Sequence, residues 1–379
     1  MMVERSKKLI GINATCFSDR PSGAKNRFVG FFRNIFNANH DINFVVYMPI
    51  DCNLSKHFSN QQNVCFKETP LKSIYPLQRF LFGLFYWFFE LRRMKFDIFE
   101  SFHLPLVKNP NGMTLLTIHD VRHIREFSWF KFIKFVIHKR AIRQADSVIT
   151  VSDSMKAEIL EIFPETQITV IYNGIDQNIN KDAHNEYKPI LKQHNIKNPF
   201  ILTVGHFEKR KNYATLLEAI QLYHKKHDSS LSLVIVGNDN GDLERIKQKI
   251  KELSINDSVT ILSGIGDSEL FSLYSASELF VFPSLYEGFG IPILESFQNE
   301  CPIITSNINV FKEITENQLL YFDPLSSEDI VDKIWCIQNS AQKKLKIVQY
   351  GKSRASAFYY NSLAVDYNDV YRDLLQNDS

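Results

Sequence analysis

Short apolar segments alternate with longer amphipathic segments along almost the whole chain of 379 residues. The short segments match β-strands and the segments between them match helices, so the pattern predicts parallel sheets covered by helices. Strands are expected at residues 9–14, 43–48, 96–99, 114–118, 147–151, 200–204, 231–236, 259–262, 279–282 and 302–305. This alternation predicts an α/β fold.

The alternation pauses once, in a polar and charged segment at residues 178–198, and then restarts. A chain of this length exceeds the size at which one hydrophobic core usually suffices, so two domains are expected. We place them at residues 1–185 and 186–352. The remaining residues, 353–379, are expected to form a terminal helix that buries Tyr and Leu on one face.

Composition excludes several classes of protein. The 44 basic and 42 acidic residues nearly cancel, so nothing in the overall charge indicates nucleic acid. The five cysteines form no Cys-x-x-Cys pair, which favours free thiols in a reducing compartment. The N-terminal residues lead into a strand rather than the apolar core of a signal peptide, and the longest apolar run, residues 80–89, is too short to cross a bilayer. We therefore expect a cytoplasmic protein.

The segment at residues 282–296 carries the clearest chemistry; it reads Phe-Pro-Ser-Leu-Tyr-Glu-Gly-Phe-Gly-Ile-Pro-Ile-Leu-Glu-Ser. Gly288 and Gly290 let the backbone approach a ligand closely and take up positive φ at little cost. The helix that follows directs unpaired N–H groups and a positive dipole end at whatever lies in front of it, and a diphosphate is the commonest anion to bind there. Glu295 lies inside this helix and has the reach to accept hydrogen bonds from two sugar hydroxyls.

A second cluster of functional residues follows the strand expected at residues 200–204. Gly205 ends this strand, and Lys209, Arg210 and Lys211 form a compact basic group before the next helix. A departing nucleoside diphosphate develops negative charge, and cations that are already in position lower the barrier by stabilising that charge. The alternative is an ordinary solvated run of Lys and Arg at the end of a strand.

Polar residues also follow the strands of the first half. Ligands of open α/β sheets bind beyond the carboxyl ends of the strands, so His103, His119 and Asp120 are placed to line a binding site. His119 and Asp120 can hydrogen-bond sugar hydroxyls or transfer protons, although a single histidine is more often structural. The loop before the first helix contains Gly23, and Lys25 and Arg27 could add positive charge beside a phosphate.

Glu287 and Glu295, with Phe-Pro-Ser before them and Gly-Phe-Gly-Ile-Pro-Ile between them, resemble the Glu-x7-Glu motif of family 4 glycosyltransferases. These are retaining enzymes with the GT-B fold. The resemblance extends over nearly the whole chain. It implies two Rossmann-like domains facing a central cleft, the first binding the acceptor and the second the nucleotide sugar, with a C-terminal helix that crosses back to the first domain.

The resemblance also implies roles for individual residues. Arg210 and Lys211 would stabilise the leaving diphosphate. Glu295 would hold the ribose, while Glu287 and His119 would orient the transferred sugar. His206 stands where many members of the family carry an additional Arg. The implied catalytic residues are His119, Asp120, Glu287, Arg210 and Lys211. The implied donor-binding residues are Gly23, Gly205, His206, Gly264, Ile265, Gly288, Phe289, Gly290, Ile291 and Glu295.

The activity implied by the resemblance is transfer of a hexose from a nucleotide sugar to a glycan or a lipid-linked acceptor, with retention at the anomeric carbon. In this family the leaving phosphate is thought to take the acceptor proton on the face of attack. The Arg-Lys-Asn sequence at residues 210–212 favours GDP-mannose, and family habit favours surface polysaccharide or lipopolysaccharide biosynthesis. No metal or other cofactor is expected, because cations and the helix dipole replace the metal in GT-B enzymes.

Other functions fit parts of the sequence. Another GT-B enzyme, such as a sugar-nucleotide epimerase or a phosphorylase, would share the fold, but no segment argues for the pyridoxal-binding Lys that a phosphorylase needs. A non-catalytic scaffold of the same fold would not need the charged residues that this chain keeps. A nicotinamide dehydrogenase is poorly supported, because no Gly-x-Gly-x-x-Gly follows the first strand.

Two aromatic and basic segments bear on the partner. Residues 80–95 and residues 127–143 both combine aromatic side chains with Arg and Lys, and in the second segment Lys131, Lys134 and His138 fall on one helical stripe. A basic aromatic helix can lie in the interface of an anionic membrane, whereas the alternative is a core helix with a solvated basic face. We favour peripheral contact with the cytoplasmic face of the plasma membrane, because a lipid-linked acceptor requires it.

Overall fold

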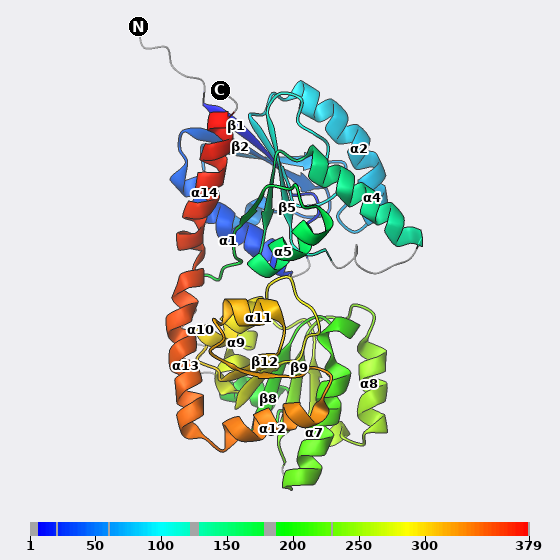
Figure 1. The fold of residues 1–379 in the computed structure, drawn as a ribbon, viewed down its shortest axis with the longest axis vertical. Coiled ribbons are helices and arrows are strands. Elements are labelled where there is room, and N and C mark those ends of the chain that lie inside the picture. The colour runs from blue at the N-terminus through cyan, green and yellow to red at the C-terminus, as the bar shows by residue number, and fades with distance from the viewer. Residues whose placement is uncertain are drawn as a thin grey trace. The chain divides into compact units, whose positions relative to one another are not determined.

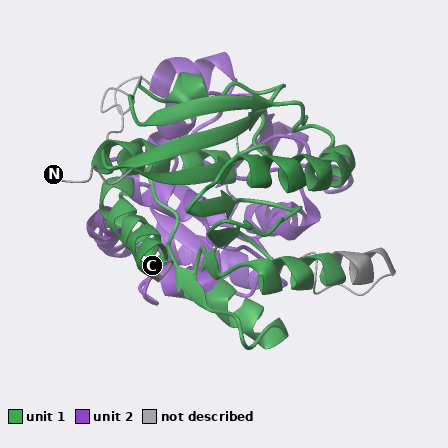
Figure 2. Cartoon of the chain, turned by 90° about the horizontal axis from the view of Figure 1, so that it is seen from above, with its two compact units in different colours: residues 1–175, 359–379 green, residues 176–358 purple. Residues whose placement is uncertain are grey.

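The chain folds into two compact units, each with its own parallel sheet and core. The structure is a computed structural model that describes residues 7–19, 22–59, 61–121, 129–177, 187–228 and 230–377. Unit 1 comprises Met1–Ile175 and Tyr359–Ser379, and unit 2 comprises Asp176–Phe358 (Figure 2). The sequence placed these divisions at 185/186 and 352/353; the units divide at 175/176 and 358/359.

Unit 1 is built on a sheet in which every pair of neighbouring strands is parallel. Its order is β3-β2-β1-β4-β5-β6-β7. Ile10 of β1 lies between Phe44 of β2 and Ile98 of β4, so β1 runs through the middle of the core. The strands are β1 (Lys8–Asn13), β2 (Ile42–Pro49), β3 (Val64–Thr69), β4 (Ile98–Ser101), β5 (Met113–Ile118), β6 (Ser147–Thr150) and β7 (Ile168–Val170).

Helices cover both faces of this sheet, because side chains of opposite faces alternate along each strand. Phe44 and Val46 of β2 belong to the core beneath α1 and α14, whereas Val45 and Tyr47 pack with Trp87 of α2. The helices of unit 1 are α1 (Gly23–Ala38), α2 (Pro76–Arg93), α4 (Trp129–Gln144), α5 (Asp153–Ile162) and α14 (Tyr360–Asn377), with a short 3-10 turn at Ser55–His57 (Figure 1).

Unit 2 repeats the plan with a sheet in the order β10-β9-β8-β11-β12-β13. All of its strand pairs are parallel. The strands are β8 (Phe200–Val204), β9 (Ser232–Val236), β10 (Val259–Leu262), β11 (Leu279–Phe282), β12 (Ile303–Ser306) and β13 (Leu320–Phe322). The helices are α6 (Tyr187–Gln193), α7 (Tyr213–His227), α8 (Leu243–Glu252), α9 (Asp267–Ala276), α10 (Ile291–Gln298), α11 (Asn309–Ile314), α12 (Ser327–Gln338) and α13 (Ala341–Ala355), with 3-10 turns at Lys209–Lys211, Asn256–Ser258 and Ser356–Phe358.

The C-terminal helix α14 returns to unit 1 and packs against α1. A buried carboxyl group holds it there: Glu100 of β4 accepts hydrogen bonds from the hydroxyls of Tyr367 and Tyr371 on α14 and from Thr117 of β5. Burial raises the pKa of Glu100, and the three hydroxyl donors counter part of that rise. A buried acidic group, which the apolar pattern did not predict, therefore anchors the last helix.

The helical C-terminal segment predicted for residues 353–379 is interrupted. The chain is helical to the end of α13 at Ala355, passes through the 3-10 turn Ser356–Phe358 and resumes as α14 at Tyr360.

No helix in the described ranges is long and apolar enough to cross a membrane.

Candidate active site

The sheet of unit 2 reverses its direction of winding between β8 and β11. Strands β9 and β10 lie on one side of β8, and β11 begins the series on the other side. Open α/β sheets bind ligands beyond the carboxyl ends of the strands at such a switch point. The basic segment after β8 and the glycine turn after β11 both start at this place, which brings two segments together that are far apart in the sequence.

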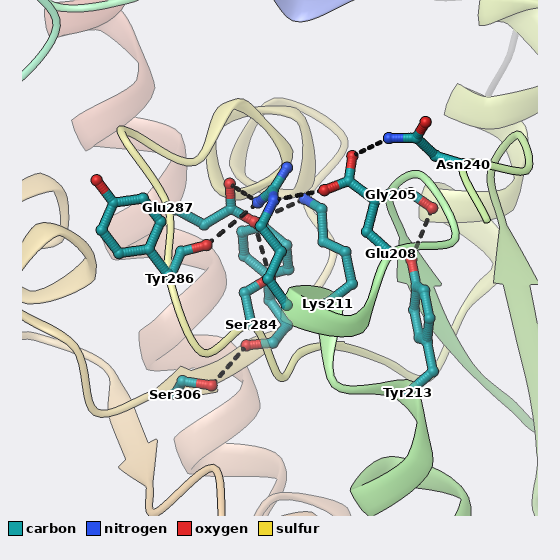
Figure 3. A network of polar contacts seen from close by, with 11 residues as sticks. Gly205, Glu208, Lys211, Tyr213, Asn240, Ser284, Tyr286, Glu287 and Ser306 are labelled. Atoms are coloured by element: carbon teal, nitrogen blue, oxygen red, sulfur yellow. Dashed lines mark hydrogen bonds and ion pairs between the residues drawn. The ribbon is translucent and has the colours of Figure 1, made fainter. Parts of the chain in front are cut away.

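The two segments meet through an ion-pair network (Figure 3). Lys211 Nζ lies 2.6 Å from Glu287 Oε1, and Arg210 Nη1 lies 2.6 Å from Glu287 Oε2. Ser284 Oγ donates a further hydrogen bond of 2.8 Å to Glu287 Oε1. Three of the predicted catalytic residues, Arg210, Lys211 and Glu287, are therefore in direct contact.

The charges of Lys211 and Glu287 are almost completely withdrawn from solvent. The side chain of Lys211 is 8% exposed and that of Glu287 is 11% exposed. Burial alone would raise the pKa of Glu287, but Lys211 and Arg210 outweigh it and hold that pKa below its usual value. Glu287 is consequently an ionised acceptor that fixes two cations, and it is not a proton donor at neutral pH.

A second layer of contacts fixes Arg210 from the other side. Glu208 accepts a hydrogen bond of 2.8 Å from Arg210 Nε, and Asn240, in the loop after β9, donates one of 2.8 Å to Glu208. Arg210 also donates from Nη1 to the Tyr286 carbonyl at 3.1 Å. Glu208 and Asn240 were not predicted as site residues. The sequence around Asn240 does not indicate this role, because its partner Glu208 lies in the loop after a different strand, β8.

Gly205 and Gly237 let the loops after β8 and β9 approach each other closely. A Cβ atom placed on Gly237 would lie 2.0 Å from the Gly205 carbonyl oxygen, and one on Gly205 would lie 2.8 Å from Cε of Lys211. Gly205 has φ of 155° and its carbonyl accepts a hydrogen bond of 2.7 Å from Tyr213. The close packing therefore requires glycine at both positions, of which the sequence analysis named only Gly205. The contact of Gly205 with the donor stays a prediction.

The second motif glutamate lies on α10, apart from the ion-pair network. Glu295 Oε2 accepts a hydrogen bond of 3.0 Å from the hydroxyl of Tyr274 on α9. Burial raises the pKa of Glu295 to about 7, and the bond from Tyr274 counters part of that rise. Tyr274 was not predicted as a site residue.

The turn before α10 follows the prediction in part. Gly290 has φ of 127° and occupies the N-cap of α10, where a Cβ atom would lie 3.0 Å from the ring of Phe311. Gly288 does not have a positive φ, so its expected conformational role is wrong. Phe289 is buried and packs edge-on against Phe358, whereas Ile291 begins the helix and is half-buried.

The loop with the predicted donor-binding residues Gly264 and Ile265 follows β10. Gly264 has φ of 70° and its N–H donates to Asn238 Oδ1 at 3.2 Å. Asn238 belongs to the loop after β9, so a side chain of the neighbouring strand fixes the loop. Ile265 is half-buried, as is His206 in the loop after β8.

In unit 1, His119 and Asp120 follow β5 as expected. His119 Nε2 is shielded from solvent and has no hydrogen-bond partner among the described residues. Burial, with a smaller contribution from the cationic Arg27, lowers the pKa of His119 to about 3. His119 is thus neutral at physiological pH, which suits hydrogen bonding to a hydroxyl better than proton donation. Asp120 is exposed.

The cations that follow Gly23 form hydrogen bonds within unit 1. Gly23 is the first residue of α1. Lys25 donates to the Ser18 and Asp19 carbonyls at 2.9 and 3.1 Å, and Arg27 donates to the carbonyls at 171 and 172 and to Asn173 Oδ1. Both cations are buried in unit 1 and tie the start of α1 to neighbouring loops. The expectation that they add charge beside a phosphate finds no support in these contacts.

The sheet of unit 1 has its own switch point between β1 and β4. Asn13 donates to Ser101 at 3.1 Å across it, and Thr15 Oγ1 lies 3.3 Å from His103 Nε2. His103, which the sequence placed at a strand end, therefore does lie at a position typical of ligand contact.

Within the described ranges, no group of three or more His, Cys, Asp and Glu side chains is placed to hold a metal ion.

The doubly wound units define the class of protein, which is the GT-B fold of glycosyltransferases. Sucrose-phosphate synthase from Thermosynechococcus elongatus superposes with a TM-score of 0.77 at 19% identity, covering 98% of this chain and 100% of that one. WaaG, a glycosyltransferase involved in lipopolysaccharide biosynthesis, gives 0.75 at 16% identity, covering 95% and 99%. Identities this low show the fold alone.

The chain belongs to glycosyltransferase family 4. Residues 37–178 match the family described as Glycosyltransferase Family 4, and residues 187–354 match Glycosyl transferases group 1. The resemblance drawn from Glu287 and Glu295 is thereby confirmed, as is the predicted fold class.

Curated proteins similar to this chain include several mannosyltransferases. The O-antigen chain mannosyltransferase RfbU of Salmonella typhimurium is 29% identical over 58% of this chain and 58% of its own length. The MMP alpha-(1->4)-mannosyltransferase of Mycolicibacterium hassiacum is 25% identical over 74% of this chain and 66% of its own length. The chain thus matches less than two thirds of the length of either relative.

Proposed function

We propose that the chain is a retaining hexosyltransferase that moves a sugar, mannose in the first instance, from a nucleotide sugar to a glycan or lipid-linked acceptor of a surface polysaccharide. The observation that carries this proposal is the contact of Lys211 and Arg210 with Glu287 at the switch point of unit 2. Glu287 holds both cations in place, and cations that are already in position stabilise the charge of a leaving diphosphate. The names of the similar mannosyltransferases support mannose as the first sugar to test.

The surroundings of each site residue suit the role that we propose for it. Lys211 and Arg210 stabilise the negative charge of the departing diphosphate, which receives the acceptor proton as the new bond forms. The N-terminal end of α10 with Gly290 faces the phosphates, since its first N–H groups have no partner within the helix. Glu295 accepts from the ribose hydroxyls, and its bond from Tyr274 sets its rotamer. The roles expected for His119 and Asp120 at the sugar stay predictions.

The proposed reaction uses no metal. In the proposed arrangement Lys211 and Arg210 bind the diphosphate, and they supply the positive charge that Mg²⁺ or Mn²⁺ gives in other transferases. Activity measured in a chelator should equal activity measured with added Mn²⁺. Loss in chelator with recovery on adding Mn²⁺ would contradict this part of the proposal.

We also propose that the protein acts at the cytoplasmic face of the plasma membrane as a peripheral protein. Residues 80–95 and residues 127–143 are the predicted contact segments. In the first, α2 exposes Phe82, Phe85 and Phe89. In the second, the side chains of Lys131 and Lys134 lie outside the described residues, and His138 is half-buried.

The first experiment is a thermal-shift panel of GDP, UDP, dTDP and ADP without metal, on the wild type, Glu295→Ala and Lys211→Ala. A ligand at about one hundred times its Kd stabilises the folded state by about 2.7 kcal/mol. One nucleotide is expected to raise the melting temperature of the wild type and of neither variant. The sugar nucleotide of that base is then offered with an acceptor extract, and the product's anomeric configuration is read by NMR.

The outcomes separate the enzyme from its alternatives. Nucleotide binding with transfer and retention supports the proposal. Nucleotide binding without turnover of any sugar nucleotide would favour the non-catalytic scaffold. A Glu295→Ala variant that binds as the wild type does would contradict the proposed role of this carboxylate.

A further inference from the structure

Unit 1 contains an apolar pocket that no step of the proposed reaction uses. It has a volume of about 550 Å³ and lies between α2, α4 and the loop at residues 104–108. Aromatic side chains of α2 form one wall, and the lining is mainly apolar. Its main side chains are Phe85, Phe88, Phe89, Leu106, Ile137 and Arg140. Ligand pockets of proteins commonly have volumes of roughly 300–1,000 Å³, so this pocket is large enough for a real occupant.

The outer face of α2, which forms the wall, is unusually apolar for a protein surface in contact with water. Trp87, Glu90 and Leu91 of α2 are buried, but large apolar side chains occupy most of its outer face. Phe85 is 71% exposed and Phe82 is 61% exposed. The other exposed apolar residues of α2 are Leu77, Leu81, Leu84, Phe88 and Phe89. A continuous apolar face of this size on a single helix marks a surface that contacts a protein or a membrane.

Basic side chains surround the mouth of the pocket. Arg140 and Lys108 line it directly, and the Arg92 guanidinium lies 3.6 Å from the ring centre of Phe88. The sequence of α4 contains five Lys and Arg residues and no acidic residue. Glu90, the acidic residue of α2, is already neutralised by Lys67 and Arg93. Asp146 is the acidic partner of Lys108, at 3.3 Å. The surroundings of the pocket are therefore positive.

An apolar pocket with a cationic rim has the chemistry of an anionic lipid. A hydrocarbon chain fits the aromatic wall, and Arg140, Arg92 and Lys108 are placed for a phosphate-bearing head group. Anionic lipids attract each nearby Lys or Arg by about 1 kcal/mol. A second copy of this chain could also cover the apolar face, but it would bring the same basic rim against this one, and like charges repel.

The geometry points to the α2–α4 pocket as a binding site for one acyl chain of an anionic phospholipid in the membrane that the protein contacts. The inference rests on the membrane contact put forward above and is independent of the sugar transfer. It goes further than surface contact, because one chain leaves the bilayer interior and enters the protein. The protein would then be held at a fixed orientation rather than resting loosely on the head groups.

Two phenylalanines of the same helix provide a matched pair. Phe85 lines the pocket, whereas Phe82 is similarly exposed on α2 and does not line it. The test is co-sedimentation of the full chain with vesicles of phosphatidylcholine containing about one third phosphatidylglycerol. Phe85→Ala is expected to weaken binding roughly tenfold, since the Phe85 ring in the pocket wall would be covered by the acyl chain. Phe82→Ala is expected to weaken binding roughly threefold or less.

The charge of the rim is tested with a second matched pair. Arg140→Glu removes a cation from the pocket, and Lys225→Glu makes the same change of charge at an exposed position on α7 of unit 2. Arg140→Glu should reduce binding to the anionic vesicles at least fivefold, and Lys225→Glu should leave it near the wild-type value. Vesicles of pure phosphatidylcholine should bind the wild type only weakly.

Entry of the chain into the pocket is read from Trp87. A Cβ atom placed on Gly83 would lie 3.8 Å from the Trp87 ring and 3.2 Å from Pro105 of the pocket lining, so Trp87 is close to the pocket wall. In a Trp129→Phe/Trp335→Phe background, vesicles with brominated acyl chains should quench Trp87. Ala141→Phe, which fills the pocket from α4, should abolish this quenching while sedimentation with vesicles largely remains. Thermal unfolding of each variant verifies that it is folded.

The outcomes distinguish the pocket from the membrane contact itself. Equal losses for Phe85→Ala and Phe82→Ala, or quenching that survives in Ala141→Phe, would overturn the pocket and leave the membrane contact standing. A wild type that binds neither vesicle would overturn both. A concentration-dependent dimer that Phe85→Ala dissociates would assign the face to a second copy and would also overturn the inference.

Discussion

Glu287→Gln is expected to destabilise unit 2 more than any other single change in the ion-pair network. The carboxylate is the shared partner of Lys211 and Arg210. Its removal leaves the nearly buried Lys211 without its ion-pair partner and leaves Arg210 paired with Glu208 alone. Breaking a buried pair by removing one partner typically costs about 3–5 kcal/mol. Lys211→Met should cost less, about 1–3 kcal/mol, because Glu287 keeps its contacts with Arg210 and Ser284.

The double variant Glu287→Gln/Lys211→Met tests the coupling. It should lose less stability than the sum of the single variants, by about 1–3 kcal/mol, because Lys211, the cation that Glu287→Gln leaves without its partner, is absent from it. Urea unfolding followed by fluorescence measures this in a Trp87→Phe/Trp129→Phe background, since Trp335 is then the only tryptophan and belongs to unit 2. Strict additivity of the two losses would refute the argument.

A nucleoside diphosphate extends the same experiment to function. If the phosphates bind to Lys211 and Arg210, they replace the negative charge missing from Glu287→Gln. A saturating diphosphate should then stabilise Glu287→Gln more than it stabilises the wild type, and it should stabilise Lys211→Met least. The opposite order would show that the phosphates do not contact these cations.

Further outcomes follow from other contacts. Because burial raises the pKa of Glu295 to about 7 and only the ionised form accepts two hydrogen bonds from ribose, affinity for a nucleotide sugar should fall as the pH drops below 7, by up to about tenfold per pH unit in calorimetric titrations. Tyr371→Phe removes a donor from buried Glu100 and should lower the free energy of unfolding of unit 1 by about 1–3 kcal/mol in urea. Gly237→Ala, whose Cβ would lie 2.0 Å from the Gly205 carbonyl oxygen, should cost about 1–3 kcal/mol of stability and weaken nucleotide binding measured by thermal shift.

Each of these predictions has a control within the chain. Glu295→Gln should flatten the pH profile, and a profile that persists in it would assign the titration to another group. Tyr359→Phe changes a half-buried tyrosine next to α14 and should be nearly neutral. A Cβ on Gly266 would enter open space, so Gly266→Ala should leave stability and nucleotide binding unchanged.

The strands that the apolar pattern missed share one property. Strands β3, β7 and β13 were not expected, and all three lie at an edge of their sheet. A central strand is covered on both faces and paired on both sides, so its residues are almost uniformly apolar. An edge strand lacks one neighbour: β3 reads Val-Cys-Phe-Lys-Glu-Thr, and five of its six residues are at least partly exposed. Its signal is therefore too weak to separate from a loop.

The candidate site was predictable where it is local in the sequence. Glu287, Gly290 and Glu295 lie within one segment, and the geometry of a turn before a helix follows from their spacing. The contacts between segments were not predictable. Lys211 and Glu287 are 76 residues apart, and Asn240 supports the network from a third loop. Which loops become neighbours depends on the order of the strands, and the periodicity of a single segment does not predict that order.

The two motif glutamates show why residue type alone does not assign chemistry. In the sequence they are equivalent carboxylates on either side of one turn. Burial raises the pKa of both, but Lys211 and Arg210 reverse this effect at Glu287, whereas Glu295 faces chiefly the neutral hydroxyl of Tyr274. Environments that move two pKa values apart assign different tasks to the two groups. Glu287 is thus a permanent counter-ion that keeps two cations in place. Glu295 is the group whose charge changes near neutral pH, so the pH dependence of donor binding should be traced to it alone.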